Sequence, residues 1–549
     1  MTKGTTWSST ESSGVFALTF GYHDESAYSA AVERLVEDKV ASGIASRDAT
    51  LWGKEAESES AKRLAWVGLS DESRHLISEI AELRERHLTA GLDHVVLCGM
   101  GGSSLAPEVI CAANGAELTV LDSSDPDFVR GALSDRLERT VVVVSSKSGG
   151  TVETDSQRRA YEHAFTEAGI DPKERMVVVT DPGSPLSSSA SEAGYELFLA
   201  DPEVGGRYSA LTAFGLVPSG LAGVDVSRLL DEAEAIRPAL EGDTVENPGL
   251  RLGALLGVAN LAGADKVVLA DGGSAFPAFG GWAEQLLAES TGKDGKGILP
   301  VVVPSQDAPN FSPSTLDEVL VTYGPEDPSV RPESGWGAAV HAALGSQLLL
   351  WEYATAVAGR LIGINPFDQP DVESAKAAAR DMLEGGTTSS DPTFTDHGIG
   401  VHDPAGWLPE DVVTVEAAMG ALLDHLDPEH GYLAVQAYLD RHRDSALEGV
   451  RETLAVRTGR PTTFGWGPRF LHSTGQYHKG GPPTGVYLQV TGDPVADLEV
   501  PGRSFSFGDF IAAQAAGDGK VLAGKGRPVL RLHLSDVATD TARLQEILA

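Results

Sequence analysis

The sequence has few cysteines, few positive charges and no long hydrophobic run. Its two cysteines, Cys98 and Cys111, both lie in apolar surroundings, so we expect buried free thiols in a reducing cytosol and no disulfide framework. No apolar segment reaches the length of a membrane span, and the first ten residues lack the apolar core of a secretory signal. These absences predict a cytoplasmic protein without a membrane partner.

Positive charge is scarce, because 42 Lys and Arg residues stand against 79 Asp and Glu residues and give a formal net charge of −37. A surface this acidic repels nucleic acid, so we expect no nucleic-acid partner. It also repels any anionic metabolite. An anion site on this chain must therefore be locally positive, and the few cations beside glycine-rich loops become informative.

The length of 549 residues is typical of two large domains or three smaller ones. Strand-like and helix-like segments alternate from residue 94 onward, which predicts an α/β fold with two doubly wound parallel sheets and helical additions. We expect an N-terminal helical wrap, a first and a second α/β domain, and a C-terminal extension that completes the second domain and the functional site. These divisions span residues 1–90, 91–224, 225–384 and 385–549.

Residues 140–154 combine a buried strand, a polar glycine-bearing loop and the start of a helix. The β-branched run Thr140–Val144 is typical of a strand that is buried on both faces. The loop adds the polar side chains of Ser146, Lys147, Ser148 and Thr151. Free backbone amides and the positive end of a helix dipole favour an anion at such a junction, so we predict a phosphate site. The spacing is not that of a Walker loop, and a plain strand-to-helix turn is the alternative.

A second glycine-rich turn follows the strand that begins at His94. Its Gly99-x-Gly101-x-x-Ser104 spacing resembles a dinucleotide-binding pattern but lacks the third glycine. The acidic residue that the pattern requires is also hard to assign, since Asp122 begins a Ser/Asp turn. A nicotinamide cofactor is therefore the weaker interpretation of this turn.

Several ionisable side chains occupy positions that suit chemistry. Glu289 ends an otherwise apolar helix, where a partly buried carboxylate could act as a general base; an ordinary helix-end glutamate is the alternative. Arg207 follows two glycines that let backbone approach a ligand, so its guanidinium could bind an oxyanion, or it is a surface residue of a turn. His472 and His478 lack a third metal ligand at a recognisable spacing, so proton transfer suits one of them better than metal binding.

Taken together, five motifs resemble the glucose-6-phosphate isomerase family, and they occur in that family's order between residues of about 90 and 380. They are Gly101–Ser103, Ser146–Glu153, Gly205–Ser209, Glu289–Lys293 and Phe367–Lys376. The segment from His472 to Val490 resembles the isomerase half of transaldolase–isomerase fusion proteins. The transaldolase half is absent, because about 90 N-terminal residues cannot hold a barrel that typically needs roughly 250.

The resemblance implies a role for each matching residue. Glu289 would move a proton between C2 and C1 of the sugar, and Arg207 would face the reacting carbons. The other implied substrate contacts are Ser146, Lys147, Ser148 and Thr151 at the phosphate, and Gly102, Ser103, Glu153, Gln285, Gln369 and Lys376 at the sugar. Lys376 is counted with the catalytic residues.

The histidine that opens the sugar ring departs from the family's order. Family members carry it between the base glutamate and the Phe-Asp-Gln motif, where this sequence offers only His341, inside an expected apolar helix over residues 338–363. His478 matches the family's histidine turn better and is the preferred candidate, with His472 expected to be a packed or capping residue. Asp371 and the pair Gly149-Gly150 are further departures from the family pattern.

The resemblance implies a homodimeric, cytoplasmic aldose–ketose isomerase of glycolysis and gluconeogenesis that interconverts glucose 6-phosphate and fructose 6-phosphate. The expected fold is a pair of sugar-isomerase-type domains, and no cofactor or metal is expected. The alternatives are an isomerase of mannose or amino-sugar phosphates on the same fold and a non-catalytic sugar-phosphate sensor. A sensor has no need of Glu289, Arg207 and Lys376 together, so their joint presence favours the enzyme.

Overall fold

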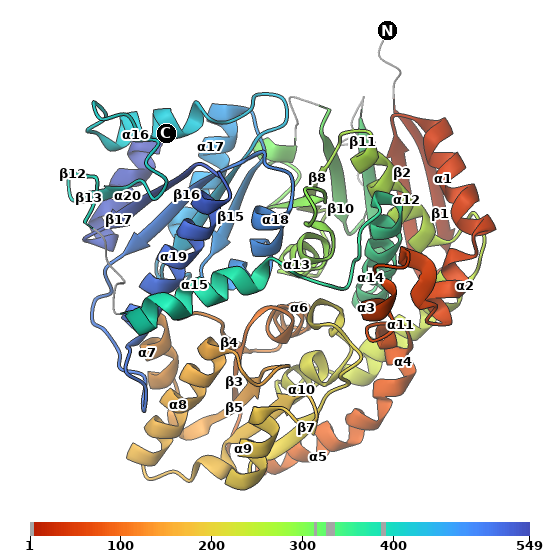
Figure 1. Cartoon of the computed structure of the whole chain (residues 1–549). Coiled ribbons are helices and arrows are strands. Elements are labelled where there is room, and N and C mark those ends of the chain that lie inside the picture. The colour runs from red at the N-terminus through yellow and green to blue at the C-terminus, as the bar shows by residue number, and fades with distance from the viewer. Residues whose placement is uncertain (1–4, 312–315, 326–334, 386–390, 549) are drawn as a thin grey trace.

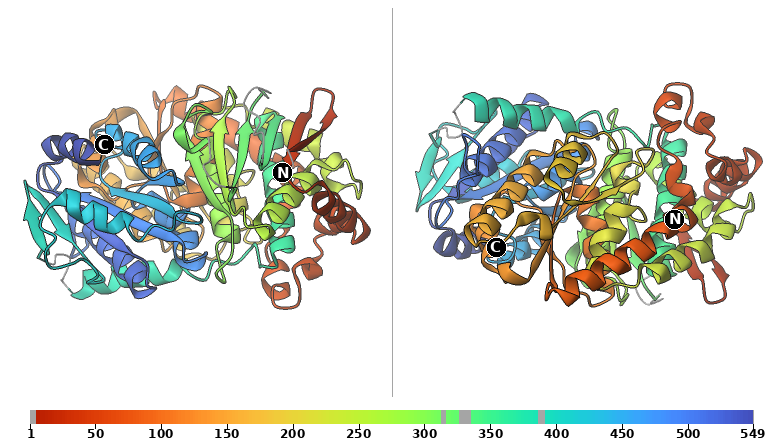
Figure 2. Two further views of the ribbon diagram at one scale, coloured as in Figure 1. Left: turned by 90° about the horizontal axis from the view of Figure 1, so that it is seen from above. Right: turned by 90° about the horizontal axis from the view of Figure 1, so that it is seen from below.

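The computed structural model describes residues 5–311, 316–325, 335–385 and 391–548, and the described elements surround three β-sheets (Figure 1). We call each sheet with its helices a unit. In Figure 1 the first-sheet unit forms the lower part, the second-sheet unit the upper right and the third-sheet unit the upper left. Seen from above in Figure 2, the second-sheet and third-sheet units lie side by side over the first.

The first sheet has five parallel strands in the order β4-β3-β5-β6-β7. Every residue of β5 is buried, because its valines alternate between helices on the two faces. Chain order reverses between β3 and β5, so a ligand crevice is expected at the carboxyl ends of these two strands. The elements are β3 (His94–Gly99), α6 (Leu105–Ala113), β4 (Thr119–Leu121), α7 (Pro126–Ser134), β5 (Thr140–Ser145), α8 (Val152–Glu167), β6 (Met176–Thr180), α9 (Pro185–Ala193), β7 (Glu196–Leu199) and α10 (Ala213–Leu221).

The second sheet has the order β1-β2-β11-β10-β8-β9, with β8 to β11 parallel and an antiparallel N-terminal hairpin added at one edge. The hairpin was not expected from the sequence, which read the N-terminal segment as helical. The elements are β1 (Thr6–Ser12), β2 (Phe16–Tyr22), α11 (Val226–Glu241), α12 (Pro248–Leu261), β8 (Lys266–Asp271), α13 (Phe279–Thr291), β9 (Leu299–Val303), β10 (Glu318–Tyr323), β11 (Trp336–Ala342) and α14 (Leu344–Ile362).

Helices lie between the hairpin and the first sheet, in the segment for which the sequence predicted a helical wrap. They are α1 (Glu25–Glu37), α2 (Val40–Ala45), α3 (Glu57–Ser60), α4 (Leu69–Glu72) and α5 (Leu76–Thr89). The expected helix over residues 338–363 is wrong at its start, because residues up to Ala342 form β11 between β10 and β2. Sheet pairing overrides the helix propensity of the alanines there. His341 consequently lies exposed on a strand and does not face the core.

The C-terminal residues build a third sheet of their own, in the order β12-β13-β17-β16-β14-β15. The α/β class is thus confirmed, but the described residues form three sheets where the sequence predicted two. Strands β14 to β17 are parallel, and β13 and β12 add antiparallel pairs. The elements are α15 (Val372–Gly385), β12 (Phe394–Asp396), β13 (Ile399–His402), α16 (Val415–Leu423), β14 (Tyr432–Tyr438), α17 (Val450–Thr458), β15 (Thr462–Trp466), α18 (Gly475–Gly480), β16 (Gly485–Gly492), α19 (Phe507–Gly524), β17 (Val529–Leu534) and α20 (Val537–Leu548).

Ion pairs join the third-sheet unit to the other two units. Arg469 binds Asp122 at 2.7 Å, with Glu108 as a second partner, at the carboxyl edge of the first sheet. Asp122 is therefore occupied by an arginine and is not available to a nucleotide ribose. Arg460 is paired with Asp317 of the second-sheet unit, and this carboxylate also binds Lys266 at 2.9 Å. The domain boundaries at residues 90, 224 and 384 stay predictions.

Candidate active site

The loop between β5 and α8 forms one wall of a cavity of about 760 Å³. Ser148, Gly150 and Thr151 line it, and the Ser148 hydroxyl accepts a hydrogen bond from the Gly150 amide at 3.2 Å. Ser146 is buried and donates to the Thr151 hydroxyl at 3.1 Å. Thr151 is the N-cap of α8 and its side chain makes no capping bond, so no Thr151 side-chain cap occupies the first amides of the helix, the groups that bind anions at helix N-termini.

Lys147 does not line this cavity. Its ammonium binds the Asp181 carboxylate at 2.7 Å and lies near the carbonyl oxygens of Asp201 and Pro202. Burial lowers the pKa of Lys147, and the Asp181 carboxylate opposes that shift. The Lys147 charge, which the sequence predicted at the phosphate site, therefore holds the loop to neighbouring residues.

The third-sheet unit and α15 supply the opposite wall of the cavity. The residues on this wall include Arg380, His472, Arg503, Phe510 and Gln514. The Arg503 guanidinium binds Asp155 of α8 at 2.6 Å, which places a cation beside the hydroxyl-bearing loop. Sequence reasoning missed Arg380, Arg503 and Gln514, although Arg503 directly follows a glycine in a chain where such cations are few.

Glu153 and His472, which both line this cavity, form a dyad. His472 Nε2 lies 3.0 Å from Glu153 Oε1, and Gln514 Nε2 donates to the same oxygen at 2.8 Å. The His472 carbonyl accepts a hydrogen bond from Gln285 at 2.8 Å. The histidine ring is thus held by a carboxylate on one side while its backbone is held by α13.

His478 occupies a different environment. It is fully buried in α18, its Nδ1 lies 3.0 Å from the Tyr432 hydroxyl, and the rings of Tyr432 and Tyr487 pack around it. Burial, followed by the Lys479 charge, lowers the pKa of His478 well below its usual value. His478 does not line the cavity, whereas His472 does.

Arg207 and Glu289 meet where the first-sheet and second-sheet units join. Both side chains are buried, with Arg207 Nη1 lying 3.6 Å from Glu289 Oε2. Arg207 also donates to the Ser290 hydroxyl at 2.8 Å and to Gln369 Oε1 at 3.1 Å. Its remaining hydrogen bonds go to the carbonyls of Pro366 and Asp368, so the guanidinium orientation is fixed.

The glycine turn after β3 brings these groups together. A Cβ on Gly102 would lie 2.0 Å from the Gly206 carbonyl, so the two backbones touch only because residue 102 has no side chain. A Cβ on Gly101 would lie 2.8 Å from Gln285 Nε2, and Gly101 has a φ of +58°. Ser103, also buried, follows directly. The turn thus connects the Arg207 segment to the helix that carries Glu289.

The Phe367–Lys376 motif lies beside the same pair. Lys293 reaches it with its buried ammonium, which binds Asp368 Oδ1 at 2.6 Å and the Asn365 carbonyl at 2.7 Å. Burial, with the Arg207 charge next, lowers the pKa of Lys293 to about 8. Asp371 accepts a hydrogen bond from Gln476 at 3.0 Å and binds Lys525 at 2.6 Å. Lys376 belongs to α15, and its side chain lies outside the described residues.

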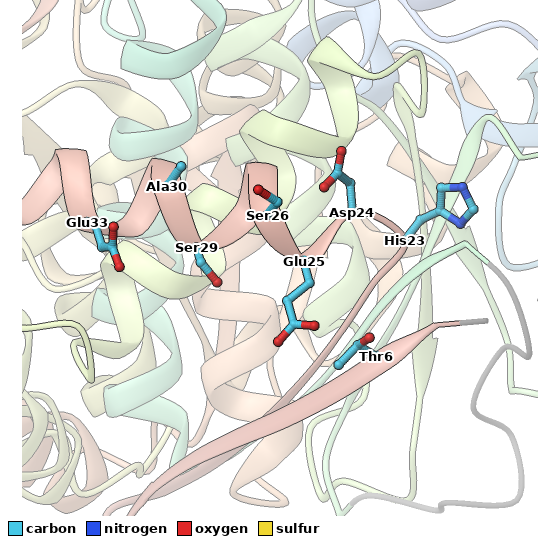
Figure 3. Close-up of a pocket in the computed structure, with 8 residues that line it drawn as sticks. All are labelled: Thr6, His23, Asp24, Glu25, Ser26, Ser29, Ala30 and Glu33. Carbon is cyan, nitrogen blue, oxygen red and sulfur yellow. The ribbon is translucent and has the colours of Figure 1, made fainter. Parts of the chain in front are cut away.

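A second large cavity, of about 730 Å³, lies at β1, β2 and the start of α1 (Figure 3). None of the residues expected at the site lines it, and its carboxylates, from Asp24, Glu25 and Glu33, repel anions. In the part of the chain that the structure describes, no cluster of three or more His, Cys, Asp or Glu side chains could hold a metal ion. No helix there is long and apolar enough to cross a bilayer.

Comparison with known proteins identifies relatives of this arrangement. The family model for phosphoglucose isomerase matches residues 68–298. A probable glucose-6-phosphate isomerase of Natronomonas pharaonis is 32% identical over 341 residues, covering 53% of this chain and 79% of the relative. A glucose-6-phosphate isomerase of Acaryochloris marina is 30% identical over 347 residues, covering 53% and 65%.

A solved structure shares the fold. The crystal structure of a glucose-6-phosphate isomerase from Chlamydia trachomatis superposes with a TM-score of 0.55 at 22% identity, covering 69% of this chain and 90% of that one. The family match, the relatives and the arrangement of the motifs agree with one another. This chain therefore belongs to the phosphoglucose isomerase family.

Proposed function

We propose that this protein is a glucose-6-phosphate isomerase that interconverts glucose 6-phosphate and fructose 6-phosphate without a cofactor. The observation that carries the proposal is the buried Glu289–Arg207 pair at 3.6 Å, connected through Gly102 and Gln285 to a cavity built for an anion. A carboxylate beside a fixed guanidinium suits a reaction that removes a proton and creates an oxyanion.

Glu289 is the general base of the proposed reaction. With the ring open, its carboxylate takes the proton from C2, and the electron pair moves to the carbonyl oxygen at C1 to give a cis-enediolate. Arg207 stabilises the negative charge that develops, since its guanidinium cannot lose its proton at neutral pH. The C2 hydroxyl then gives its proton to the oxygen at C1, and Glu289 returns its own proton to C1 as the C2 oxygen becomes the carbonyl, which yields the ketose. Gly102, Ser103, Gln285, Gln369 and Lys376 are proposed to border the sugar.

His472 is the proposed ring-opening residue, in place of His478. Opening the ring moves a proton from the C1 hydroxyl to the ring oxygen, and an imidazole can accept and donate near neutral pH. His472 lines the cavity with Glu153 at 3.0 Å, which supports this role because a carboxylate fixes the ring's orientation. His478 is buried among tyrosines, and its lowered pKa makes it a poor proton acceptor.

The phosphate is proposed to lie against Ser148, Thr151 and the first amides of α8, with Ser146 supporting Thr151. Lys147 contributes by holding the loop, and Arg380 and Arg503 supply the positive charge that faces the cavity. These remote contacts would position C1 and C2 against Glu289. A homodimer in the cytoplasm is proposed from the family alone.

The test is direct. Fructose 6-phosphate formation from glucose 6-phosphate is followed with purified protein and a metal chelator present, beside the same assay on mannose 6-phosphate and glucosamine 6-phosphate. The expected result is turnover of glucose 6-phosphate that the chelator leaves unchanged and that exceeds turnover of the other two. Absence of turnover with correctly folded protein, or preference for another sugar phosphate, would contradict the proposal.

A further inference from the structure

The two faces of the third sheet differ in chemical character. The face toward α16, α17 and α20 is an apolar core that includes Val401, Val435, Leu488 and Leu532. Side chains alternate along a strand, so the neighbouring positions share the other face. The polar residues on that face, which α19 covers, are His402, Gln436, Gln489, Thr491, Arg531 and His533.

A cavity of about 490 Å³ opens on this polar face, at the carboxyl ends of β14 and β16. Chain order reverses between these two strands, because β15 lies on one side of β14 and β16 on the other. This is the position at which open α/β sheets bind ligands. The cavity therefore combines a favourable place in the fold with a polar wall.

Arg531 is the one lysine or arginine among the described residues that line the cavity. Within those residues its guanidinium has no hydrogen-bond or ion-pair partner. Burial lowers the pKa of Arg531, as expected for a cation that has lost water without gaining a counterion. A half-buried guanidinium left in this state is costly, and an anion in the cavity would relieve that cost.

The acidic residues of the wall are engaged elsewhere. Asp497 Oδ1 accepts the Gly508 amide at 2.8 Å, and Asp509 Oδ2 accepts the Ser506 amide at 3.1 Å. Asp493 is largely exposed and lies 3.3 Å from His533 Nε2. None of the three neutralises Arg531, and their free oxygens can still accept hydrogen bonds from hydroxyl groups of a ligand.

Uncharged donors accompany the arginine. His402 Nδ1 is buried and has no hydrogen-bond partner, and the same holds for Gln436 Nε2 deeper on this face. Burial, followed by the Arg531 charge, lowers the pKa of His402 to about 4, so its ring is neutral at physiological pH. A neutral ring can donate one hydrogen bond without adding a second positive charge.

We propose that this cavity is a second ligand site, which binds a small hydroxyl-bearing oxyanion with its carboxylate or phosphate on Arg531 and its hydroxyl groups toward the acidic rim. The site is separate from the active-site cavity but shares α19 with it. One side of the helix presents Ile511 and Ala515 to this site, and the other presents Phe510 and Gln514 to the active site. The ligand therefore lies one helix away from the Glu153–His472 dyad.

Calorimetric titration with two probes tests the site and separates the sources of the anion. The probes are inorganic phosphate and gluconate, used at millimolar concentration on full-length Ser148→Ala/Thr151→Ala protein, in which phosphate binding at the active site is weakened. Arg531→Gln is then added, and Arg457→Gln, an arginine of α17 outside the cavity, is the matched control. We expect one site per chain and at least tenfold weaker binding after Arg531→Gln, with no change after Arg457→Gln.

A second variant distinguishes loss of the binding site from misfolding caused by Arg531→Gln. Ala512→Leu keeps Arg531 but fills the cavity from α19, so it should abolish the same binding. Binding of gluconate alone assigns a carboxylate ligand, and binding of phosphate alone assigns a phosphorylated one. The proposal is overturned if neither probe binds, or if Arg531→Gln and Ala512→Leu both bind as the parent does. Isomerase activity does not enter this readout, so a failure of this proposal can be distinguished from a failure of the proposed function.

Discussion

The two walls of the proposed active-site cavity differ in the groups that they offer to an anion. The wall from the first-sheet unit offers short hydroxyl groups and backbone amides, at Ser148, Gly150 and Thr151. The wall from α15 and the third-sheet unit offers long side chains, including Arg503, His472 and Gln514. The first wall is fixed by the end of a buried strand. The second is fixed by ion pairs and hydrogen bonds that cross between units, such as Arg503 with Asp155.

This difference suits one wall to binding and the other to proton transfer. Backbone amides cannot exchange protons usefully, so they bind and position. Side chains on the opposite wall can carry charge and move protons, but only if their partners hold them in place. In a chain of net charge −37, the second wall also carries the two arginines that line the cavity, Arg380 and Arg503. Substitutions that separate binding from proton transfer test this division.

The largest effect is expected at Glu289, which belongs to neither wall. Glu289→Gln should lower kcat by about 10²–10⁴-fold, because an amide cannot accept the C2 proton. Binding of the sugar phosphate should persist, since both walls stay intact. Steady-state kinetics and a binding titration measure the two quantities. A wild-type kcat in this variant would show that another group removes the proton.

The next largest effect is expected at His472 on the third-sheet wall. His472→Ala should lower kcat with the cyclic substrate by about 10²-fold, since ring opening loses its proton shuttle. Proton exchange on an open-chain sugar-phosphate analogue should remain. His341→Ala, at an exposed strand position, is the matched control. If His472→Ala turned over the cyclic sugar normally, or lost both activities together, ring opening would have to be assigned elsewhere.

How far the sequence could predict these walls depends on the distance between partners along the chain. The first wall, Arg207 and Glu289 lie in contiguous motifs, so local patterns are enough to propose them. The His472 ring is held by Glu153, which lies 319 residues away along the chain. No local pattern around His472 predicts that contact. The sequence around His478 matches the family's histidine turn better, but the His478 side chain packs among tyrosines. The third sheet was missed because residues 385–549 were assigned to an extension of the second domain, whereas β14 to β17 pair with one another. Its edge strands β12 and β13 are short and lie in a polar segment that resembles a loop.

A moderate effect should distinguish Arg503, which lines the cavity, from Lys147, which does not. Arg503→Gln should raise KM for glucose 6-phosphate by about tenfold, the low end of the roughly 1.5–3 kcal/mol of a charge-assisted hydrogen bond, because Arg503 also binds Asp155. Lys147→Gln should raise KM less, since its ammonium is bound to Asp181. Arg159→Gln is the control, because Arg159 pairs with the same Asp155 but does not line the cavity. A larger KM effect for Lys147→Gln than for Arg503→Gln would reverse the assignment.

The last effect concerns how the third-sheet unit docks, and it appears in stability and not in turnover. Glu318 is buried next to the Asp317–Arg460 pair, and burial, followed by the Asp317 charge, raises the pKa of Glu318 to about 8. The folded protein therefore keeps a proton on Glu318 between about pH 4.5 and 8, whereas the unfolded chain releases it. Since the folded state binds more protons in that window, this group makes stability fall as pH rises, by up to about 1.4 kcal/mol per pH unit.

Glu318→Gln should remove this contribution, because an amide does not titrate. The free energy of unfolding, measured by denaturant titration at several pH values, should fall less steeply toward pH 8 than in the wild type. Glu416→Gln, at an exposed position in the first turn of α16, should leave the slope unchanged. Parallel slopes for Glu318→Gln and wild type would mean that the carboxyl is already ionised in the folded protein. In that case Lys266 and Arg460 would balance two ionised carboxylates, those of Asp317 and Glu318. Protonation of these carboxylates at low pH would then weaken the docking of the third-sheet unit.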